Sequence, residues 1–326
     1  MAIDWSGFVT LVRQHSRFLL TTHVRPDADG LGSKLALAEA LQTLGKDVRM
    51  VIASSWPPLY RFLDPKEHIR RFKLPGDEYR DCDAIVVLDT GTWNQLGDFG
   101  TFMKSSSAVK AVIDHHISHD DLGAARFVDT SAEATGRLVH DAIGALGVPL
   151  TPNSANMLFS ALATDTGWFR HSNTTPATFS LAEKLVTAGA RPTWLYEQIY
   201  EQNTLPRLQL RGRALTRLQA VEGGKVAFLE VHLDDYEVTG AIPADTEDLI
   251  NYPRSLTCVE VAMLFAEQQA GGVKVSFRSR GKVDVARLAE SFDGGGHRLA
   301  SGAIIQASLD EAKTRVLDAV RAALNR

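Results

Sequence analysis

Four separate stretches of the chain carry aspartate and histidine side chains that could hold metal ions. They are an H-x-x-x-D-x-D pattern, a single aspartate, an Asp-His-His triplet and a last aspartate. The candidate residues are His23, Asp27 and Asp29; Asp89; Asp114, His115 and His116; and Asp165. Several ionised carboxylates in one cleft need cations to neutralise them. Mixed imidazole and carboxylate donors around an open, roughly six-coordinate site suit Mn²⁺, for which Mg²⁺, Co²⁺ or Fe²⁺ could substitute.

Two metal ions in such a site would favour one type of chemistry. Ions about 3.5–4 Å apart share a bridging carboxylate and a water, lower the pKa of that water and clamp a phosphoryl group for in-line attack. The residues therefore predict hydrolysis of a phosphate ester or anhydride. An aspartate that follows a buried strand is often only a turn or helix cap, so Asp89 or Asp165 alone would indicate little. The four stretches together favour the metal interpretation.

The elements around these stretches must bring them together. The runs Phe18–Thr22, Ala84–Leu88 and Val109–Ile113 are almost wholly apolar, as is typical of strands buried on both faces of a parallel sheet. A candidate stretch follows each run directly. Because the carboxyl ends of parallel strands meet at one edge, where open α/β folds bind ligands, we expect the stretches to meet there. Helical patterns between the runs predict a doubly wound α/β domain.

Two helices are expected after the third strand. The sequence T-S-A-E at Thr130–Glu133 resembles a capping box, which would begin a helix that Gly147 and Pro149 end. A further helix from about Pro152 leads towards Asp165. The second helix would deliver the last carboxylate to the same edge of the sheet.

The rest of the chain has a different pattern. The segment from Thr178 to Gln219 is helical and is broken by Gly223 and Gly224. Four strand-like runs with helices between them follow, and a helix capped by Ser308 closes the chain, which together predict a mixed sheet. We expect a metal-binding domain at residues 1–190, a helical linker at 191–222 and a smaller α/β domain at 223–326.

Composition excludes several kinds of protein. The 326 residues carry a formal net charge of -4, which offers no broad surface for polyanions and argues against long duplex DNA as a substrate. Cys82 and Cys258 lie far apart, without a C-x-x-C partner, so neither a disulfide framework nor a zinc site is expected. The sequence has no signal-like start and no apolar run of membrane-spanning length. We expect a cytoplasmic protein that does not bind membranes.

The motifs resemble those of a known family. The four stretches are similar, in order and spacing, to the motifs of the DHH phosphoesterase superfamily. F-R-S-R at Phe277–Arg280 and G-G-G-H at Gly294–His297 are similar to its DHH-associated C-terminal domain. The resemblance covers nearly the whole chain and is closest to the bifunctional oligoribonucleases and pAp phosphatases, or nanoRNases of the NrnA type. It implies hydrolysis of very short RNA to mononucleotides, removal of the 3′-phosphate of pAp to give AMP, and a homodimer.

The resemblance also implies a role for each metal-binding candidate. The residues implied to hold one ion are His23, Asp27 and Asp89, and those implied to hold the other are Asp29, Asp89, His115 and Asp165. Asp89 would bridge the two ions. Asp114 would orient an imidazole by accepting its ring N–H. His116 would face the phosphate, where it could stabilise charge or protonate the leaving oxygen.

The substrate-binding candidates lie in the C-terminal part and are Arg278, Ser279, Gly295, Gly296 and His297. A guanidinium can bind a terminal phosphate bidentately, and glycine backbone N–H groups can approach a phosphate closely. In an arbitrary sequence, the G-G-G-H pattern would be only a flexible turn. Arg25 and Arg170 lie within metal-site motifs and could contact substrate. The histidines without motif partners, which we interpret as surface or partly buried residues, are His15, His68, His119, His140 and His232.

Rival functions remain at this point. The chain could hydrolyse linear or cyclic dinucleotides such as pApA, pGpG or cyclic di-AMP. A RecJ-like exonuclease would need further modules than 326 residues provide, and G-G-G-H argues against an inorganic pyrophosphatase of the same superfamily. A catalytically inactive nucleotide-binding regulator would be expected to have lost metal ligands, and every expected ligand is present.

Overall fold

The computed structural model describes residues 3–324, which form two compact units. The first ends at Gln202 and the second begins at Asn203. Of the predicted linker, helix α8 (Pro192–Tyr200) belongs to the first unit, and helix α9 (Leu205–Thr216) belongs to the second. Within residues 3–324, no helix combines the length and the apolar character that a membrane span needs.

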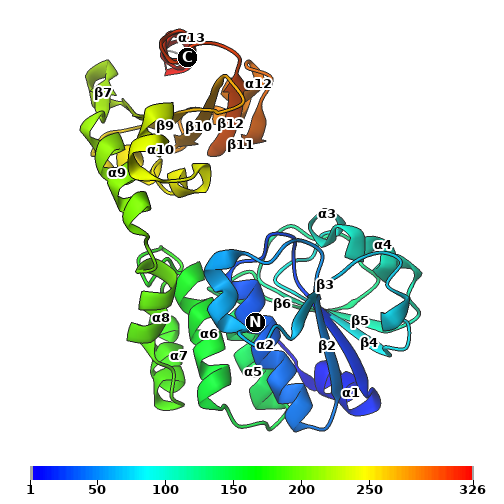
Figure 1. Cartoon of the computed structure of the whole chain (residues 1–326). Coiled ribbons are helices and arrows are strands. Elements are labelled where there is room, and N and C mark those ends of the chain that lie inside the picture. The colour runs from blue at the N-terminus through cyan, green and yellow to red at the C-terminus, as the bar shows by residue number, and fades with distance from the viewer. Residues whose placement is uncertain (1–2, 325–326) are drawn as a thin grey trace. The chain divides into compact units, whose positions relative to one another are not determined.

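The first unit is built on a six-stranded parallel sheet, as the apolar runs predicted (Figure 1). Its strands are β1 (Arg17–Thr21), β2 (Asp47–Ile52), β3 (Ile69–Arg71), β4 (Ala84–Leu88), β5 (Val109–Asp114) and β6 (Ala125–Val128). Their order is β3-β2-β1-β4-β5-β6. The chain therefore leaves β1 in one direction across the sheet and β4 in the other. The crevice between the carboxyl ends of two such strands is where open α/β sheets bind ligands.

Helices cover both faces of this sheet. They are α1 (Ser6–Gln14), α2 (Ala28–Thr43), α3 (Trp93–Leu96), α4 (Asp98–Ser105), α5 (Thr135–Ala145), α6 (Pro152–Asp165), α7 (Pro176–Thr187) and α8, with short 3₁₀ turns at Pro58–Leu63 and Asp77–Tyr79. Successive residues of β1 point to opposite faces. Phe18 and Leu20 join the core under α2, α5 and α6, whereas Leu19 joins the core under α4 (Figure 1). Both faces are thus apolar, which explains the uninterrupted hydrophobic strands.

The predicted capping box at Thr130–Glu133 is wrong. Helix α5 begins at Thr135, and its N-cap, Ala134, has no side-chain hydrogen bond. The hydroxyl and the backbone N–H of Ser131 instead donate to Asp129, which forms a local turn. The first N–H groups of α5 donate to the Asp29 carboxylate of helix α2. A partner distant in sequence therefore caps this helix.

The second unit contains the mixed sheet that the sequence predicted. Its strands are β7 (Gln219–Val221), β8 (Val226–Val231), β9 (Val261–Glu267), β10 (Val273–Ser279), β11 (Gly295–His297) and β12 (Ala300–Ile305). They lie in the order β11-β12-β10-β9-β8-β7, and β8 and β9 are parallel while the other pairs are antiparallel. G-G-G-H therefore contributes an edge strand rather than only a turn.

Helices pack on both faces of the second sheet as well. They are α9, α10 (Leu233–Thr239), α11 (Asn251–Ser255), α12 (Val285–Glu290) and α13 (Leu309–Leu324), with 3₁₀ turns at Glu222–Gly224 and Pro243–Thr246. One core lies under α12 and α13, and the other lies under α9 and α10. The Glu311 N–H donates to the Ser308 hydroxyl at the start of α13, as the sequence predicted.

A buried ion pair joins α9 to α10 and predicts an acid-sensitive stability. Asp235 is fully buried and accepts hydrogen bonds from Arg213 Nε at 2.5 Å and Arg217 Nη1 at 2.6 Å. Burial alone would raise the pKa of Asp235, but the hydrogen bonds from both arginines outweigh it and lower the pKa to about 2. Because the folded-state pKa lies below the usual 3.8, this contribution is present above pH 4 or so and is lost as the pH falls towards about 2.

We therefore expect Asp235→Asn to lower the free energy of unfolding of the second unit by about 2 kcal/mol at pH 7. Circular dichroism in urea follows the unfolding of both units. Tryptophan fluorescence reports only on the first unit, because all five tryptophans lie there, so comparison of the two signals isolates the second unit. The matched control is Asp234→Asn, whose side chain is 62% exposed and should contribute little. If Asp235→Asn lowered the free energy of unfolding by the same amount at pH 7 and at pH 2.5, the ion-pair explanation would be contradicted.

Candidate metal centre

The predicted metal-binding side chains converge at the carboxyl edge of the parallel sheet. Three sets of donor atoms each lie within 4.8 Å of one another. The sets are His23, Asp27 and Asp89; Asp29, His115 and Asp165; and Asp89, His115 and His116. They come from the loops after β1, β4 and β5, from the start of α2 and from the end of α6. Asp89, which follows β4 at the switch point, is shared between two sets.

Two histidines present the same ring nitrogen to this centre. His23 Nε2 lies 3.4 Å from Asp89 Oδ2 and 3.8 Å from Asp27 Oδ1. His115 Nε2 lies 3.4 Å from Asp165 Oδ2, 3.7 Å from Asp29 Oδ2 and 3.8 Å from Asp89 Oδ1. The Nδ1 atoms lie 3.0 Å and 3.1 Å from the backbone oxygens of Val24 and Ala132. A ring that donates Nδ1–H to a carbonyl keeps Nε2 free to bind a metal.

The N-terminus of α5 supports two of the carboxylates, which sequence reasoning missed. The backbone N–H groups of Thr135 and Gly136 donate to Asp29 at 2.7 and 2.8 Å, and the Thr135 hydroxyl donates to Asp89 Oδ1 at 2.9 Å. A helix N-terminus stabilises an anion, and these bonds fix both carboxylates. The sequence contains no local signal of this contact, because its capping-box pattern at Thr130–Glu133 indicated a local cap that α5 does not have.

The electrostatics of the centre favour cations. Burial raises the pKa of Asp29, and the charges of Asp89 and Asp165 raise it further. Burial and the charges of Asp89 and Asp27 raise the pKa of Asp165 to about 6, against the opposing charge of His115. Burial lowers the pKa of His23, but hydrogen bonds to Asp27 and Asp89 outweigh it and raise the pKa to about 10. The carboxylates therefore hold positive charge strongly, which is what a site for divalent ions requires.

The packing around Gly30 also fits an ion. A Cβ at Gly30 would lie 2.3 Å from Thr22 Oγ1, 3.2 Å from Asp89 Oδ2 and 3.3 Å from His23 Nε2. Three polar atoms therefore border a point that only glycine leaves open. Thr22 Oγ1 is buried and has no hydrogen-bond partner within residues 3–324. A buried hydroxyl without a partner is costly, so an ion or its bound water beside Thr22 would supply the missing partner.

Asp114 lies outside these donor sets, and its neighbour His116 belongs to the third of them. Asp114 is fully buried, and its Oδ1 accepts hydrogen bonds from the backbone N–H of His116 at 3.2 Å and from His116 Nδ1 at 2.7 Å. The hydrogen bond to Asp114 raises the pKa of His116 to about 9. The His116 side chain is 49% exposed. Asp114 therefore orients a partly exposed imidazole, and that imidazole belongs to His116.

The predicted substrate-binding residues lie in the second unit. His297 pairs with Ala300, which pairs on its other side with Arg278. Arg278 and His297 thus share one row and one face of the sheet. Within residues 3–324, no carboxylate forms an ion pair with Arg278, and burial and the charge of Arg254 lower its pKa.

The other three substrate candidates differ in exposure. Gly295 and Gly296 are exposed on β11. Gly296 has φ +144, and a Cβ there would lie 2.6 Å from Ser301 Cα, so the strand requires glycine. Ser279 is buried, and its hydroxyl already donates to Glu260 and accepts from the Gly281 N–H. Backbone N–H groups are therefore accessible on β11, whereas the Ser279 hydroxyl is engaged within the unit.

Comparisons with known proteins agree with this architecture. The N-terminal domain of the DHH family matches residues 17–162, and the DHHA1 domain matches residues 223–326. The chain belongs to the DHH/DHHA1 phosphoesterase family. A bifunctional oligoribonuclease and PAP phosphatase NrnA from Thermus thermophilus is 34% identical, over 94% of this chain and 90% of the relative. The protein of that name from Bacillus subtilis is 27% identical, over 95% and 96%.

A solved structure shows the same fold. An exopolyphosphatase-related protein from Bacteroides fragilis superimposes with a TM-score of 0.85 and 23% sequence identity, over 97% of this chain and 95% of that one. For a chain of the DHH/DHHA1 family, the His and Asp sets at the switch point are the candidate site of a metal-dependent phosphoesterase.

The Thr135 hydroxyl provides a test of the support around Asp89. We expect Thr135→Val to lower Mn²⁺ affinity and kcat/KM by about 10–100-fold, because Asp89 loses a donor while the backbone bonds to Asp29 persist. Calorimetric Mn²⁺ titration and steady-state kinetics measure the two effects. Thr135→Ser retains the hydroxyl and should behave like the wild type; an equal loss in both variants would assign the effect to packing.

Proposed function

We propose that this chain hydrolyses very short RNA oligonucleotides to mononucleotides and removes the 3′-phosphate of pAp to give AMP, with two divalent metal ions. The observation that carries the proposal is the meeting of two donor sets at the switch point: Asp89 belongs to the set with His23 and Asp27, and its Oδ1 lies 3.8 Å from His115 Nε2 of the set with Asp29 and Asp165. Relatives named for these two activities, which match nearly the full length of the chain, support the choice of substrates.

The metal assignment is part of this proposal. One ion would be held by His23, Asp27 and Asp89, and the other by Asp29, Asp89, His115 and Asp165. Their oxygen-rich donor set suits Mn²⁺ better than a metal that prefers thiolates. When bound, the ions would lower the pKa of a shared water and neutralise the phosphoryl oxygens.

The protein's own groups would orient and protonate the substrate. His116 is partly exposed, and its hydrogen bond with Asp114 favours the protonated imidazole. It would donate a hydrogen bond to the phosphate and then a proton to the leaving oxygen. Asp114, which is fully buried, would hold the ring in that orientation rather than contact the substrate.

The second unit would bind a phosphate of the substrate. Arg278 lacks a carboxylate partner within residues 3–324, and His297 lies in the same row of the sheet. The glycines of β11 would bring backbone N–H groups close to the same phosphate.

We further propose a homodimer in the cytoplasm. The free thiols of Cys82 and Cys258 support a reducing compartment.

Substrate comparison tests the proposal. The purified protein with Mn²⁺ is incubated with pAp, a 5′-phosphorylated RNA dinucleotide, pApA, cyclic di-AMP and a 24-nucleotide RNA. We expect turnover of pAp and the short RNA, little turnover of the long RNA, and loss of activity in Asp89→Asn. Turnover confined to cyclic di-AMP would make it a signalling phosphodiesterase. Absence of turnover with Mn²⁺ shown to be bound would make it a nucleotide-binding protein.

A further inference from the structure

The Asp114 carboxylate has one oxygen that the proposed mechanism does not use. Oδ1 accepts both hydrogen bonds from His116, whereas Oδ2 is buried without a hydrogen-bond partner within residues 3–324. The nearest ion-pair neighbour of Oδ2 is His119 Nδ1, at 3.7 Å. A third imidazole therefore faces the side of Asp114 opposite to His116.

His119 is held firmly in this place. Its side chain is only 8% exposed, and its Nε2 lies 2.6 Å from the backbone oxygen of His116. The ring lies against Gly91, where a Cβ would be 1.9 Å from His119 Nδ1. The expectation that His119 is an ordinary surface or partly buried residue therefore omits its contacts with the Asp-His-His motif.

The segment that contains His119 joins two loops of the metal centre. His119 forms a parallel bridge with Gly91, and the Asp120 N–H donates to the Gly91 oxygen at 2.8 Å. Asp120 Oδ2 also accepts from the Trp93 N–H at 2.8 Å. The loop after β5, which carries His116, is thus fastened to the loop after β4, which carries Asp89.

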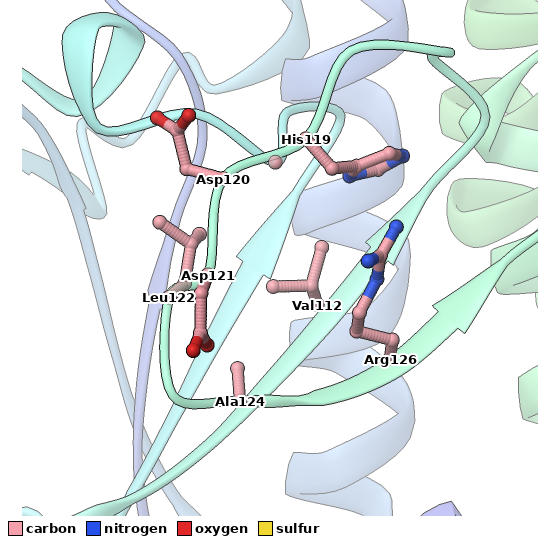
Figure 2. A pocket seen from close by; sticks show the side chains of 8 residues that line it. Val112, His119, Asp120, Asp121, Leu122, Ala124 and Arg126 are labelled. Atoms are coloured by element: carbon pink, nitrogen blue, oxygen red, sulfur yellow. The ribbon is translucent and has the colours of Figure 1, made fainter.

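A small cavity adjoins the ring. Figure 2 shows the side chains of His119, Val112 and Arg126 among those that line one pocket. Its volume is about 170 Å³. Because this space is continuous with the ring of His119, removal of the ring would leave room for a free imidazole.

We propose that His119 is a positioning residue, which fixes the backbone of His116 and closes the buried side of Asp114, so that Asp114 keeps the His116 ring aimed at the phosphate. The inference rests on the proposed role of His116. Its geometric basis is the bond to the His116 oxygen, the approach to Asp114 Oδ2 and the bridge to Gly91. A ring that merely filled space would need none of the three.

The kinetic test uses His119→Ala, His116→Ala and the double variant. We expect His119→Ala to lower kcat for pAp by about 10–100-fold, with little change in KM or calorimetric Mn²⁺ affinity. The double variant should be no slower than His116→Ala, because the two residues act as a unit. Free imidazole should restore part of the activity of His119→Ala. The matched control is His140→Ala, whose ring bonds to the exposed Asp141, far in sequence from the Asp-His-His motif.

Two results would overturn the proposal. One is additive losses in the double variant, and the other is a loss of Mn²⁺ affinity in His119→Ala as large as its loss of kcat. If His119→Ala does not fold, His119→Asn, which retains a donor for the His116 oxygen, takes its place in the same cycle.

A measurement without turnover separates this proposal from the proposed function. NMR of the metal-free protein should show a slowly exchanging His116 Nδ1 proton, bonded to Asp114, in the wild type but not in His119→Ala. An unchanged signal overturns the positioning role even if pAp is a substrate. A lost signal supports it even if pAp proves not to be one.

Discussion

Asp89→Asn is expected to lower turnover by roughly three orders of magnitude, the largest loss that any single substitution in this chain should cause. The change keeps the shape of the side chain but removes its charge, and Asp89 is the donor that two candidate sets share. Loss of a ligand that both proposed ions share would remove several kcal/mol of charge stabilisation, and each 1.4 kcal/mol or so is a factor of ten. Steady-state kinetics with pAp at saturating Mn²⁺ measures the loss.

The same substitution should act differently on stability. Without metal, the melting temperature of Asp89→Asn should differ little from that of the wild type, because the Asp89 charge disfavours ionisation of the buried Asp29 but stabilises the protonated His23. Added Mn²⁺ should raise the wild-type melting temperature by mass action and the variant's much less. Asp47→Asn, at the opposite end of the sheet and 53% exposed, is the control. A normal Mn²⁺-dependent rise in Asp89→Asn would contradict the shared-ligand assignment.

Gly30→Ala is expected to lower activity by up to about 100-fold, since a misplacement of 1 Å in a reactive centre can cost that much and smaller shifts of the ligands cost less. Helix propensity alone would make alanine more stable than glycine by about 1 kcal/mol in a helix interior. The sign of the change in stability therefore depends on packing. The added Cβ would lie 2.3 Å from Thr22 Oγ1 and within 3.3 Å of Asp89 Oδ2 and His23 Nε2. Both ligands must then move, and Mn²⁺ titration should show weaker binding.

A matched pair of variants tests this explanation. Gly144 lies within α5, and a Cβ there meets no atom within 4 Å. Gly144→Ala should therefore leave activity unchanged and stabilise the protein by up to about 1 kcal/mol. The double variant Gly30→Ala with Thr22→Ala removes the closest clash. It should recover part of the stability that the clash costs Gly30→Ala, although two tight contacts remain. Full activity in Gly30→Ala would show that catalysis does not depend on the space beside Gly30.

The parts of the structure that could be predicted are those in which the local pattern and the tertiary role coincide. Runs such as Ala84–Leu88 are apolar because the strand is buried on both faces, and the carboxyl ends of parallel strands must share one edge. The convergence of the His and Asp side chains was therefore predictable without coordinates. The mixed second sheet followed from its four longer strand-like runs, whereas β7 and β11 have only three residues each and carry little pattern.

The parts that could not be predicted depend on partners distant in sequence. Asp29 and Thr135 are 106 positions apart, so no local capping rule identifies this pair. His119 carries no motif partner in the sequence, and its role depends on Gly91 in another loop. Ser279 matches a family motif, but its hydroxyl is committed to Glu260. Residue type indicates what a side chain can do, and tertiary contacts decide what it is available for.

The strand order also bears on how the protein is made. The sheet places β1 beside β4, and the candidate donors extend along the chain from His23 to Asp165. A ribosome-bound chain that ends before α6 lacks part of one donor set. Non-local parallel pairing is also slow. The nascent chain must therefore complete most of the first unit before all the candidate donors are present, and we expect metal binding to follow the folding of this unit rather than to nucleate it.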